Sequence, residues 1–288
     1  MNPNSDRIEP LRYWSDFRMQ LAWVYTGFPS NGYREWSYDS KPQTAWLIRK
    51  GSVTLKFSLE NETYGAGQWV FPKTEDGTQE FSEDAEILSV RFIAEWPTGE
   101  LLFDRSKSYS RAMSELREFT RISERLARAV SREFPEIYSS LPHVPGSHRC
   151  YFNFQRLLYG WIQAYSLVME GFGLTARTIG PIDDRIREAI HTMETQRLSY
   201  SLREKDLAAH SGLSISQFNK LFHRDVGITP KEYWENKRIE NARIALLGSV
   251  RSIKSIAMDL GFSSLPHFSG WVKKNLGKSP REFRSAQV

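Results

Sequence analysis

Polar and basic side chains alternate with apolar ones between residues 214 and 226. Phe218, Leu221 and Phe222 recur at spacings of three and four, which predicts an amphipathic helix with these side chains on its inner face. The outward positions are Ser216, Gln217, Asn219, Lys220, His223 and Arg224. Such side chains donate hydrogen bonds and carry positive charge, so the chemistry they offer is the binding of an anionic partner.

A second segment repeats this pattern about fifty positions later. The residues from Leu207 to Tyr233 return as those from Ile256 to Phe283, with an offset of 49 up to the first glycine and of 50 after it. The outward positions of the second copy are Ser264, Leu265, His267, Ser269, Lys273 and Lys274. A duplicated helix-turn-helix explains this spacing, and that motif points to DNA as the partner.

Turn and cap residues indicate how the two outer faces are positioned. Gly212 permits the positive φ of a tight turn between helices, and Ser214 is expected to cap the helix that follows. Gly227 ends that helix, and Thr229-Pro230-Lys231-Glu232 starts the next one with a capping box and a proline at its first position. Ser279-Pro280-Arg281-Glu282 repeats this start signal in the second copy.

The two reading helices are predicted at about residues 214–226 and 264–275. A helix from Pro230 to about Leu247 separates them, and at ~1.5 Å per residue it spans about 27 Å. This length is compatible with placing the reading helices in successive major-groove segments on one face of a duplex, roughly 34 Å apart.

Two stretches carry a resemblance to a known family: LAAHSGLSISQFNKLFHRDVGITPKEY and IAMDLGFSSLPHFSGWVKKNLGKSPREFR. Together they resemble the DNA-binding domain of the AraC family of bacterial transcription factors, over residues from about 200 to 284. The resemblance implies a sequence-specific transcriptional regulator, most often an activator. It also implies a double-stranded DNA operator, RNA polymerase and a second copy of the chain as partners.

Alignment with the family implies roles for single side chains. The base-facing positions of the first reading helix are Ser216, Asn219 and Lys220. Lys220 is expected to donate to guanine O6 or N7, and Asn219 to pair with adenine or with a phosphate. The residues better suited to phosphates are Arg224, Lys273 and Lys274.

The second copy departs from the family pattern where a long polar side chain is common. Leu265 and Gly270 occupy outward positions there, and Pro266 lies in the first turn of the helix. We therefore expect weaker base readout by this copy, through Ser264, His267 and Ser269, and through contact of Leu265 with a thymine methyl group.

Charge is divided unevenly along the chain. From Asp183 to the end there are 18 Lys and Arg residues against 12 Asp and Glu, whereas residues 1–182 contain 21 against 22. The basic balance therefore belongs to the carboxy-terminal part. Binding to a phosphate backbone requires such an asymmetry, because each neutralised phosphate releases condensed counterions.

Cysteine content and hydropathy limit the class of protein. The single cysteine, Cys150, excludes a disulfide within the chain and fits a reducing compartment. It also argues against a DNA-repair alkyltransferase with the same DNA-binding module, which would need several cysteines for metal and methyl capture. No apolar stretch approaches membrane-spanning length, so we expect a cytoplasmic protein.

Residues from about 10 to 105 are predicted to form short strands punctuated by Gly, Asn and Pro, which favours a small β-barrel. The predicted strands include Thr44–Ile48, Val53–Phe57, Gln68–Phe71 and Ile87–Ile93. TAWLIRKGSVTLKF and YGAGQWVFP resemble the cupin-like effector domain that precedes many AraC-type DNA-binding domains. The expected organisation is an α+β multidomain protein: a cupin-like β domain (1–108), a helical connector (109–172), a linker (173–182) and an all-α domain of two helix-turn-helix units (183–288).

Aromatic residues are frequent in the predicted β domain, which contains six of the nine tryptophans. Rings at a barrel mouth can stack on a sugar or another small cyclic effector, with arginine supplying directional hydrogen bonds. The candidates for this ligand site are Arg34, Trp36, Tyr38, Trp46 and Arg49. The alternative is that these rings belong to the core.

No histidine precedes His143, so the histidine positions of the cupin metal motifs are unoccupied. His143, His148 and Cys150 are close in sequence, but they lie in a Pro/Gly loop and lack a fourth ligand. We therefore expect no metal, no cofactor and no enzymatic activity.

The connector is predicted to contain two amphipathic helices. Their apolar stripes are Met113, Leu116, Phe119, Ile122, Leu126, Val130 and Phe134 in the first, and Tyr151, Phe154, Leu158, Trp161, Tyr165 and Val168 in the second. Such stripes serve either as a seam between two copies of the chain or as packing onto the barrel. Two functions remain open at this point: a regulator controlled by a small molecule in the β domain, and a constitutive DNA-binding regulator whose barrel only mediates dimerisation.

Overall fold

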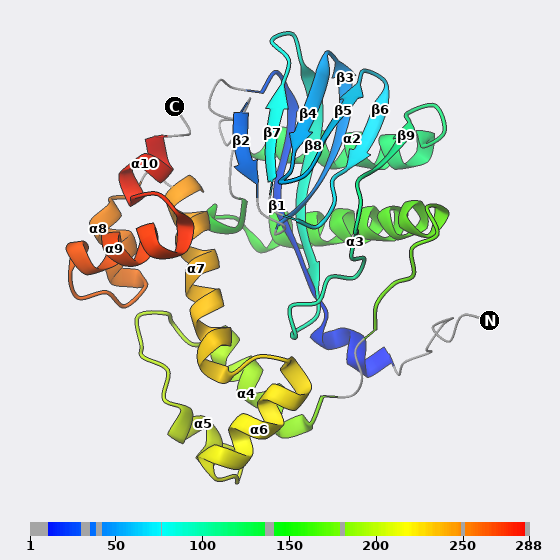
Figure 1. Cartoon of the computed structure of the whole chain (residues 1–288). Helices are drawn as coiled ribbons and strands as arrows, with labels where there is room; N and C mark the ends of the chain where they lie inside the picture. The colour runs from blue at the N-terminus through cyan, green and yellow to red at the C-terminus, as the bar shows by residue number, and fades with distance from the viewer. Residues whose placement is uncertain are drawn as a thin grey trace.

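The computed structural model describes residues 11–29, 35–38, 42–75, 77–135, 141–178, 182–248 and 251–285. A β-rich amino-terminal domain carries two long helices on one side, and a helical domain extends from its edge (Figure 1). The long helix α7 (Pro230–Gly248) runs through this second domain and has helices grouped at both of its ends. The fold class predicted from the sequence is confirmed.

The amino-terminal domain contains two antiparallel sheets. The strands are β1 (Arg18–Gly27), β2 (Glu35–Tyr38), β3 (Gln43–Lys50), β4 (Ser52–Lys56), β5 (Asn61–Gly65), β6 (Gln68–Phe71), β7 (Gly77–Phe81), β8 (Glu86–Glu95) and β9 (Tyr109–Ala112). One sheet has the order β1-β8-β3-β6-β9 and the other β2-β7-β4-β5. Four of these strands, β3, β4, β6 and β8, match the predicted strands to within two residues at each end.

Strand β3 separates the two cores of this domain because its side chains alternate between the faces of the sheet. Trp46 and Ile48 point between the two sheets, where they pack with Val53, Val70 and Phe81. Ala45 and Leu47 belong to the larger core on the opposite face. The interior between the sheets is therefore filled by side chains, which is usual for a small β-barrel or sandwich.

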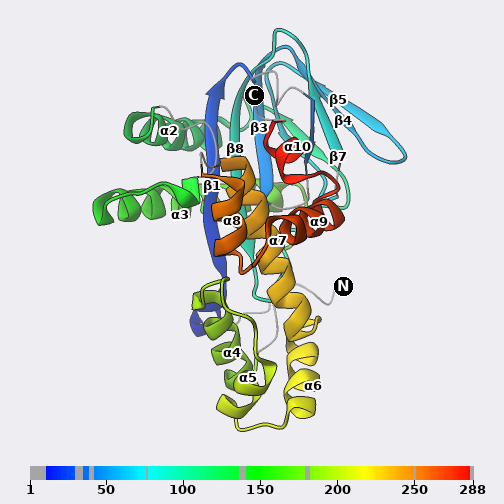
Figure 2. The same ribbon diagram turned by 90° about the vertical axis from the view of Figure 1, so that its left-hand side faces the viewer.

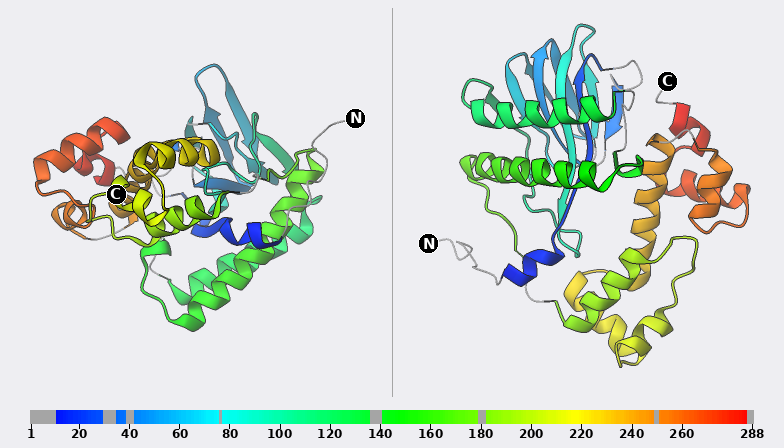
Figure 3. Two further views of the ribbon diagram at one scale, coloured as in Figure 1. Left: turned by 90° about the horizontal axis from the view of Figure 1, so that it is seen from below. Right: turned by 180° about the vertical axis from the view of Figure 1, so that it is seen from behind.

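Helices α2 (Arg117–Glu133) and α3 (His148–Gly171) lie side by side across the five-stranded sheet (Figure 3). Most of each predicted apolar stripe accounts for this packing, since Phe119 and Leu126 of α2 and Leu158 and Trp161 of α3 are buried in the same core. Met113 and Tyr151, predicted as the first residues of the two stripes, are exposed instead. Tryptophan N–H groups also reach hydroxyls on α2: Trp69 donates to Thr120 and Trp161 to Ser123, both over 2.8 Å. Packing onto the five-stranded sheet is thus the role of the inner stripes.

The carboxy-terminal domain is entirely helical. Its elements are α4 (Asp184–Thr195), α5 (Glu204–His210), α6 (Ile215–Val226), α7, α8 (Ile253–Asp259), α9 (Leu265–Leu276) and α10 (Pro280–Ser285). Figure 2 shows α4, α5 and α6 around the first half of α7, and α8, α9 and α10 around its second half. Each group encloses its own apolar core, around Phe218 and Phe222 in one and around Phe268 and Val272 in the other.

The two cores are tied together by the loop between α4 and α5. Leu198, in this loop, packs against both clusters. Close approach of the loop to α8 requires a glycine at position 261, because a Cβ there would lie 2.9 Å from the carbonyl oxygen of Leu198. Within the residues that the structure describes, no helix is long and apolar enough to cross a membrane.

Candidate nucleic-acid interface

The first reading helix, α6, begins and ends where the turn chemistry predicts. Ser214 accepts a hydrogen bond from the backbone N–H of Gln217, and the Gln217 side chain accepts from the backbone N–H of Ser214. This reciprocal pair is a capping box and satisfies two of the free N–H groups of the first turn. Gly227 ends the helix with a φ of 81°, which favours glycine.

The second reading helix, α9, repeats this construction. Ser264 accepts from the backbone N–H of His267, Pro266 lies in the first turn, and Gly277 ends the helix with a φ of 76°. The helices that follow also start alike. Thr229 and Glu232 cap α7 reciprocally, while Ser279 and Glu282 cap α10. The duplication predicted from the sequence is therefore present in the cap geometry as well as in the core.

The outward side chains of α6 are accessible to a large partner. The exposed members of the predicted set are Ser216, Gln217, Lys220, His223 and Arg224. Lys220 forms no ion pair with any residue that the structure describes, so its charge is available to an anionic ligand. The side chain lies one helical turn after Ser216, on the same edge of the helix.

Arg224 has an internal partner, unlike Lys220. Its Nε donates to Asp225 over 2.6 Å, and the Asp225 carboxylate raises the pKa of the guanidinium. The same carboxylate accepts from the backbone N–H of Asp183 over 2.9 Å, which joins the start of α4 to the end of α6. Part of the charge of Arg224 is thus offset within the domain, so a phosphate contact here gains less than one at an unpaired lysine.

Asn219 differs from the other predicted base-facing residues. Its side chain is half-buried, and its Nδ2 donates to Glu204 at the start of α5 over 3.0 Å. Its Oδ1 is buried and has no hydrogen-bond partner among the described residues. In this structure Asn219 therefore joins α6 to α5, and its amide does not point outward toward a base.

The predicted outer face of α9 is exposed apart from one residue. Ser264, Leu265, His267, Lys273 and Lys274 are all accessible, whereas Ser269 is half-buried. Lys274 has no ion-pair partner within the described part of the chain, and Lys273 lies near the carboxylate of Glu282. The face combines an apolar start with a cationic end, because Leu265 and Pro266 occupy the first turn and the lysines the last.

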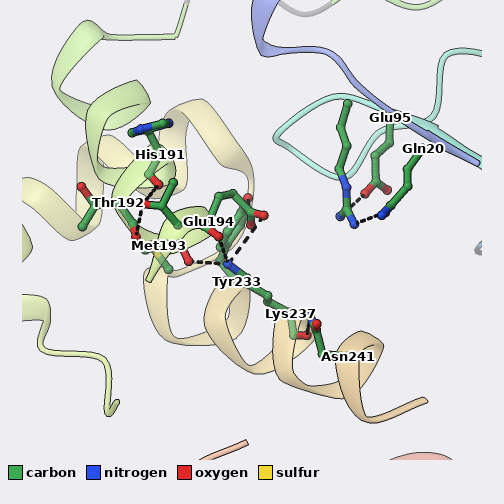
Figure 4. Close-up of polar contacts among 11 residues, drawn as sticks. Gln20, Glu95, His191, Thr192, Met193, Glu194, Tyr233, Lys237 and Asn241 are labelled. Atoms are coloured by element: carbon green, nitrogen blue, oxygen red, sulfur yellow. Dashed lines mark hydrogen bonds and ion pairs between the residues drawn. The ribbon is translucent and has the colours of Figure 1, made fainter. Parts of the chain in front are cut away.

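The first helix-turn-helix unit consists of α4, α5 and α6 with the first half of α7, and the second of α8, α9 and α10 with its second half (Figure 2). Helix α7 is anchored to the first unit by Lys237 and Tyr233, which converge on the end of α4 (Figure 4). Lys237 donates to the backbone carbonyls of Met193 and Glu194 over 2.5 and 2.6 Å, and Tyr233 donates to the Glu194 carboxylate over 3.0 Å. An ammonium group is favourable at this position because the last carbonyls of a helix carry partial negative charge. Burial nonetheless lowers the pKa of Lys237.

The next residue, Arg238, anchors α7 to the second unit. Its Nε and one terminal nitrogen both donate to the Leu260 carbonyl at the end of α8, over 3.3 and 3.1 Å. The guanidinium lies 4.4 Å from the centre of the Phe262 ring and pairs with Glu235 over 3.1 Å. Glu235 in turn accepts from the indole N–H of Trp271 in α9. Consecutive residues of one helix thus hold both units, which fixes the mutual orientation of the two reading helices.

Comparison with known proteins identifies this arrangement. A helix-turn-helix domain family matches residues 207–286. The arabinose operon regulatory protein of Escherichia coli (strain K12) is 31% identical over 105 residues, which is 36% of this chain and 36% of that protein. Residues 207–286 form an AraC-type helix-turn-helix domain. The regulatory protein PocR of Salmonella typhimurium agrees, with 34% identity over 110 residues, or 38% of this chain and 36% of that protein.

The similarity to these relatives spans about a third of their length. Similarity in fold extends further. The crystal structure of ToxT from Vibrio cholerae O395 matches with a TM-score of 0.50 and 12% identity, covering 95% of this chain and 99% of that chain. The overall fold, a β-rich domain followed by a helical domain, is therefore shared by a solved structure.

The structure does not bring the predicted ligand residues of the β domain together. Trp46 is buried between the sheets, 5.5 Å from the Phe81 ring, whereas Arg49 points from the other face of β3 and pairs with Glu124 of α2 over 3.0 Å. These two residues cannot contact one small ligand. Arg34 lies outside the described residues, as do the side chains of Trp36 and Tyr38 in β2.

A cavity of about 770 Å³ lies instead between the β domain and the AraC-type domain. Arg18 and Glu95 line it from β1 and β8, and Lys237, Glu240 and Arg243 line it from α7. Glu240 is largely buried, and this burial raises the pKa of its carboxyl group. Sequence patterns could not reveal the cavity, because its walls come from separate segments, around residues 15–18, 93–99, 190–194 and 228–243, that meet only in the folded chain.

Proposed function

We propose that the protein regulates transcription by inserting α6 and α9 into two successive major-groove segments of a DNA operator. The observation that carries this proposal is a duplicated exposed face, polar and basic, on two helices whose mutual orientation is fixed by α7. Lys220 supplies base readout, and Lys273 and Lys274 bind phosphates. A relative is named for operon regulation. From the resemblance to the AraC family we further propose activation as the outcome and RNA polymerase as a further partner.

Lys220→Ala is expected to weaken binding to the preferred DNA site by about 1 to 3 kcal/mol and to relax the sequence preference of the protein. The reason is that the Lys220 ammonium group no longer donates a hydrogen bond to a base edge. Lys274→Ala is expected to weaken all sequences alike, because a phosphate contact carries no sequence information. Fluorescence anisotropy at one stated salt concentration measures both effects, on a site selected from random DNA and on a scrambled duplex.

Lys107→Ala is the matched control, since Lys107 is an exposed lysine of the β domain. It should leave both affinities unchanged. Equal affinity of the wild type for selected and scrambled DNA, or unchanged affinity in both variants of the AraC-type domain, would show that this face does not read DNA.

Two copies of the chain are proposed to associate through the outer side of α3. Its exposed positions include Phe152, Tyr159 and Leu167, which follow one another at near-heptad spacing. The outer side of α2 is charged instead, with exposed Arg117, Glu118, Arg121, Arg125 and Arg128. An apolar stripe on one helix is suited to a symmetric contact with its own copy.

A small molecule is proposed to control DNA binding from the cavity between the domains. The interior between the sheets is occupied by Trp46, Val70 and Phe81, whereas this junction encloses a cavity of about 770 Å³ that can admit a metabolite. Its lining of cationic and carboxylate groups suits a polar effector, of which a sugar is one example. A thermal-shift screen separates this proposal from constitutive binding, because a ligand at 100 times its Kd stabilises the protein by about 2.7 kcal/mol.

A further inference from the structure

Each reading helix begins with a large apolar side chain that remains accessible to solvent. Ile215 is the first residue of α6 and is 45% exposed, and Leu265 is the first residue of α9 and is 40% exposed. Both directly follow a capping serine, Ser214 or Ser264, whose hydroxyl accepts from the third residue of its helix. The two side chains therefore occupy equivalent positions in the two units.

Neither side chain has a role in the cores of the units. The first core is built on Phe218 and Phe222 and the second on Phe268 and Val272, and neither Ile215 nor Leu265 packs against these clusters in the described residues. A single exposed apolar side chain is unremarkable on a protein surface. Two at the same position of a duplicated unit, both on the face proposed to bind DNA, indicate a shared apolar partner.

The major groove offers one apolar group on its base edges, the 5-methyl group of thymine. In helix-turn-helix domains the amino-terminal residues of the reading helix are those that contact base edges. Polar groups are few at the start of α9: Ser264 and His267 are exposed there, but Pro266 carries no donor and Gly270, one turn later, has no side chain. Apolar contact by Leu265 is thus a means of readout that this end of the second helix adds to its two polar residues.

We propose that Ile215 and Leu265 each contact a thymine methyl group, one in each of the two major-groove segments. The preferred operator then carries thymine at one defined position in both segments, about ten base pairs apart. This inference rests on the proposed DNA-binding function; it adds Ile215 as a specificity-determining residue and pairs it with the contact expected for Leu265 from the sequence. Ser216 and Lys220 remain the hydrogen-bonding part of the first segment.

Deoxyuridine substitution tests the proposal, because it removes only the methyl group and keeps the pairing edge of the base. Each thymine of a site selected from random DNA is replaced singly, and the affinity of the full chain is measured. At one position in each segment the affinity should fall about threefold to tenfold, as expected for a buried methyl group. Ile215→Ala should abolish the penalty in the first segment only, and Leu265→Ala in the second only.

Met258→Ala is the matched control, since Met258 is an exposed apolar residue of α8, outside both reading helices. It should preserve both penalties. If every deoxyuridine substitution leaves the affinity unchanged and the protein still prefers the selected site, the proposal is overturned while the DNA-binding function stands. Penalties that persist in both alanine variants also overturn it. Absence of any sequence preference would instead refute the function itself.

Discussion

Gly261→Ala is expected to destabilise the AraC-type domain by about 3 kcal/mol, whereas Gly212→Ala at the equivalent position should cost about 1 kcal/mol. Both glycines have a positive φ, 81° and 64°, so alanine is strained at either position. Only Gly261 faces a crowded backbone, with the carbonyl oxygens of Leu198 and Ser199 2.9 and 3.1 Å from an added Cβ. The space around Gly212 is open.

Urea unfolding followed by tryptophan fluorescence measures the difference, since Trp234 and Trp271 belong to or pack against the two cores of this domain. Gly212→Ala is the control because it adds the same methyl group at the same turn. The larger cost at 261 should be accompanied by loss of operator binding, because the shifted loop carries Leu198, which joins the two units. Equal destabilisation by the two substitutions would mean that the loop does not pack against α8 as described.

Arg238→Met is expected to cost about 2 to 3 kcal/mol and to lower operator affinity by about tenfold. The substitution keeps the apolar stem but removes the hydrogen bonds to the Leu260 carbonyl and the contact with the Phe262 ring. It also leaves Glu235 without its cation, while that carboxylate still accepts from Trp271. The second unit should remain folded but be held less firmly against α7.

Lys231→Met is the control for this prediction, because Lys231 is an exposed cation near the start of the same helix. Unfolding in urea and operator affinity are measured for both variants at the same salt concentration. Arg238→Lys should restore only part of the stability, since an ammonium group cannot reproduce two donors and a planar stack. An affinity that is unchanged in Arg238→Met would show that firm attachment of the second unit is not needed for binding.

Much of the AraC-type domain could be predicted because its signals are local. Caps, turn glycines and helical spacing depend on residues within a few positions of one another, and Ser214, Gly227 and Thr229 behave as expected. The strands of the β domain with strong alternation, β3 and β8 among them, were predictable for the same reason.

The features that the sequence did not predict depend on contacts between distant segments. Asn219 is polar and sits on the outer side of its helix pattern, yet Glu204 on a neighbouring helix holds its amide. Trp46 looks like a ligand-stacking ring, but strand alternation places it in the filled interior between the sheets. The anchoring roles of Lys237 and Arg238 also require knowledge of where α4 and α8 end.

Insertion of base pairs between the two contacted segments of a selected operator tests the central claim, that α7 holds both reading helices as one rigid pair. One, five or ten base pairs are added, and affinity for the full chain is measured for each duplex. The rigid pair predicts a loss of at least about tenfold for every insertion, because only the original spacing fits both helices at once. Full affinity with ten added base pairs would contradict it, since that result requires two units that move independently.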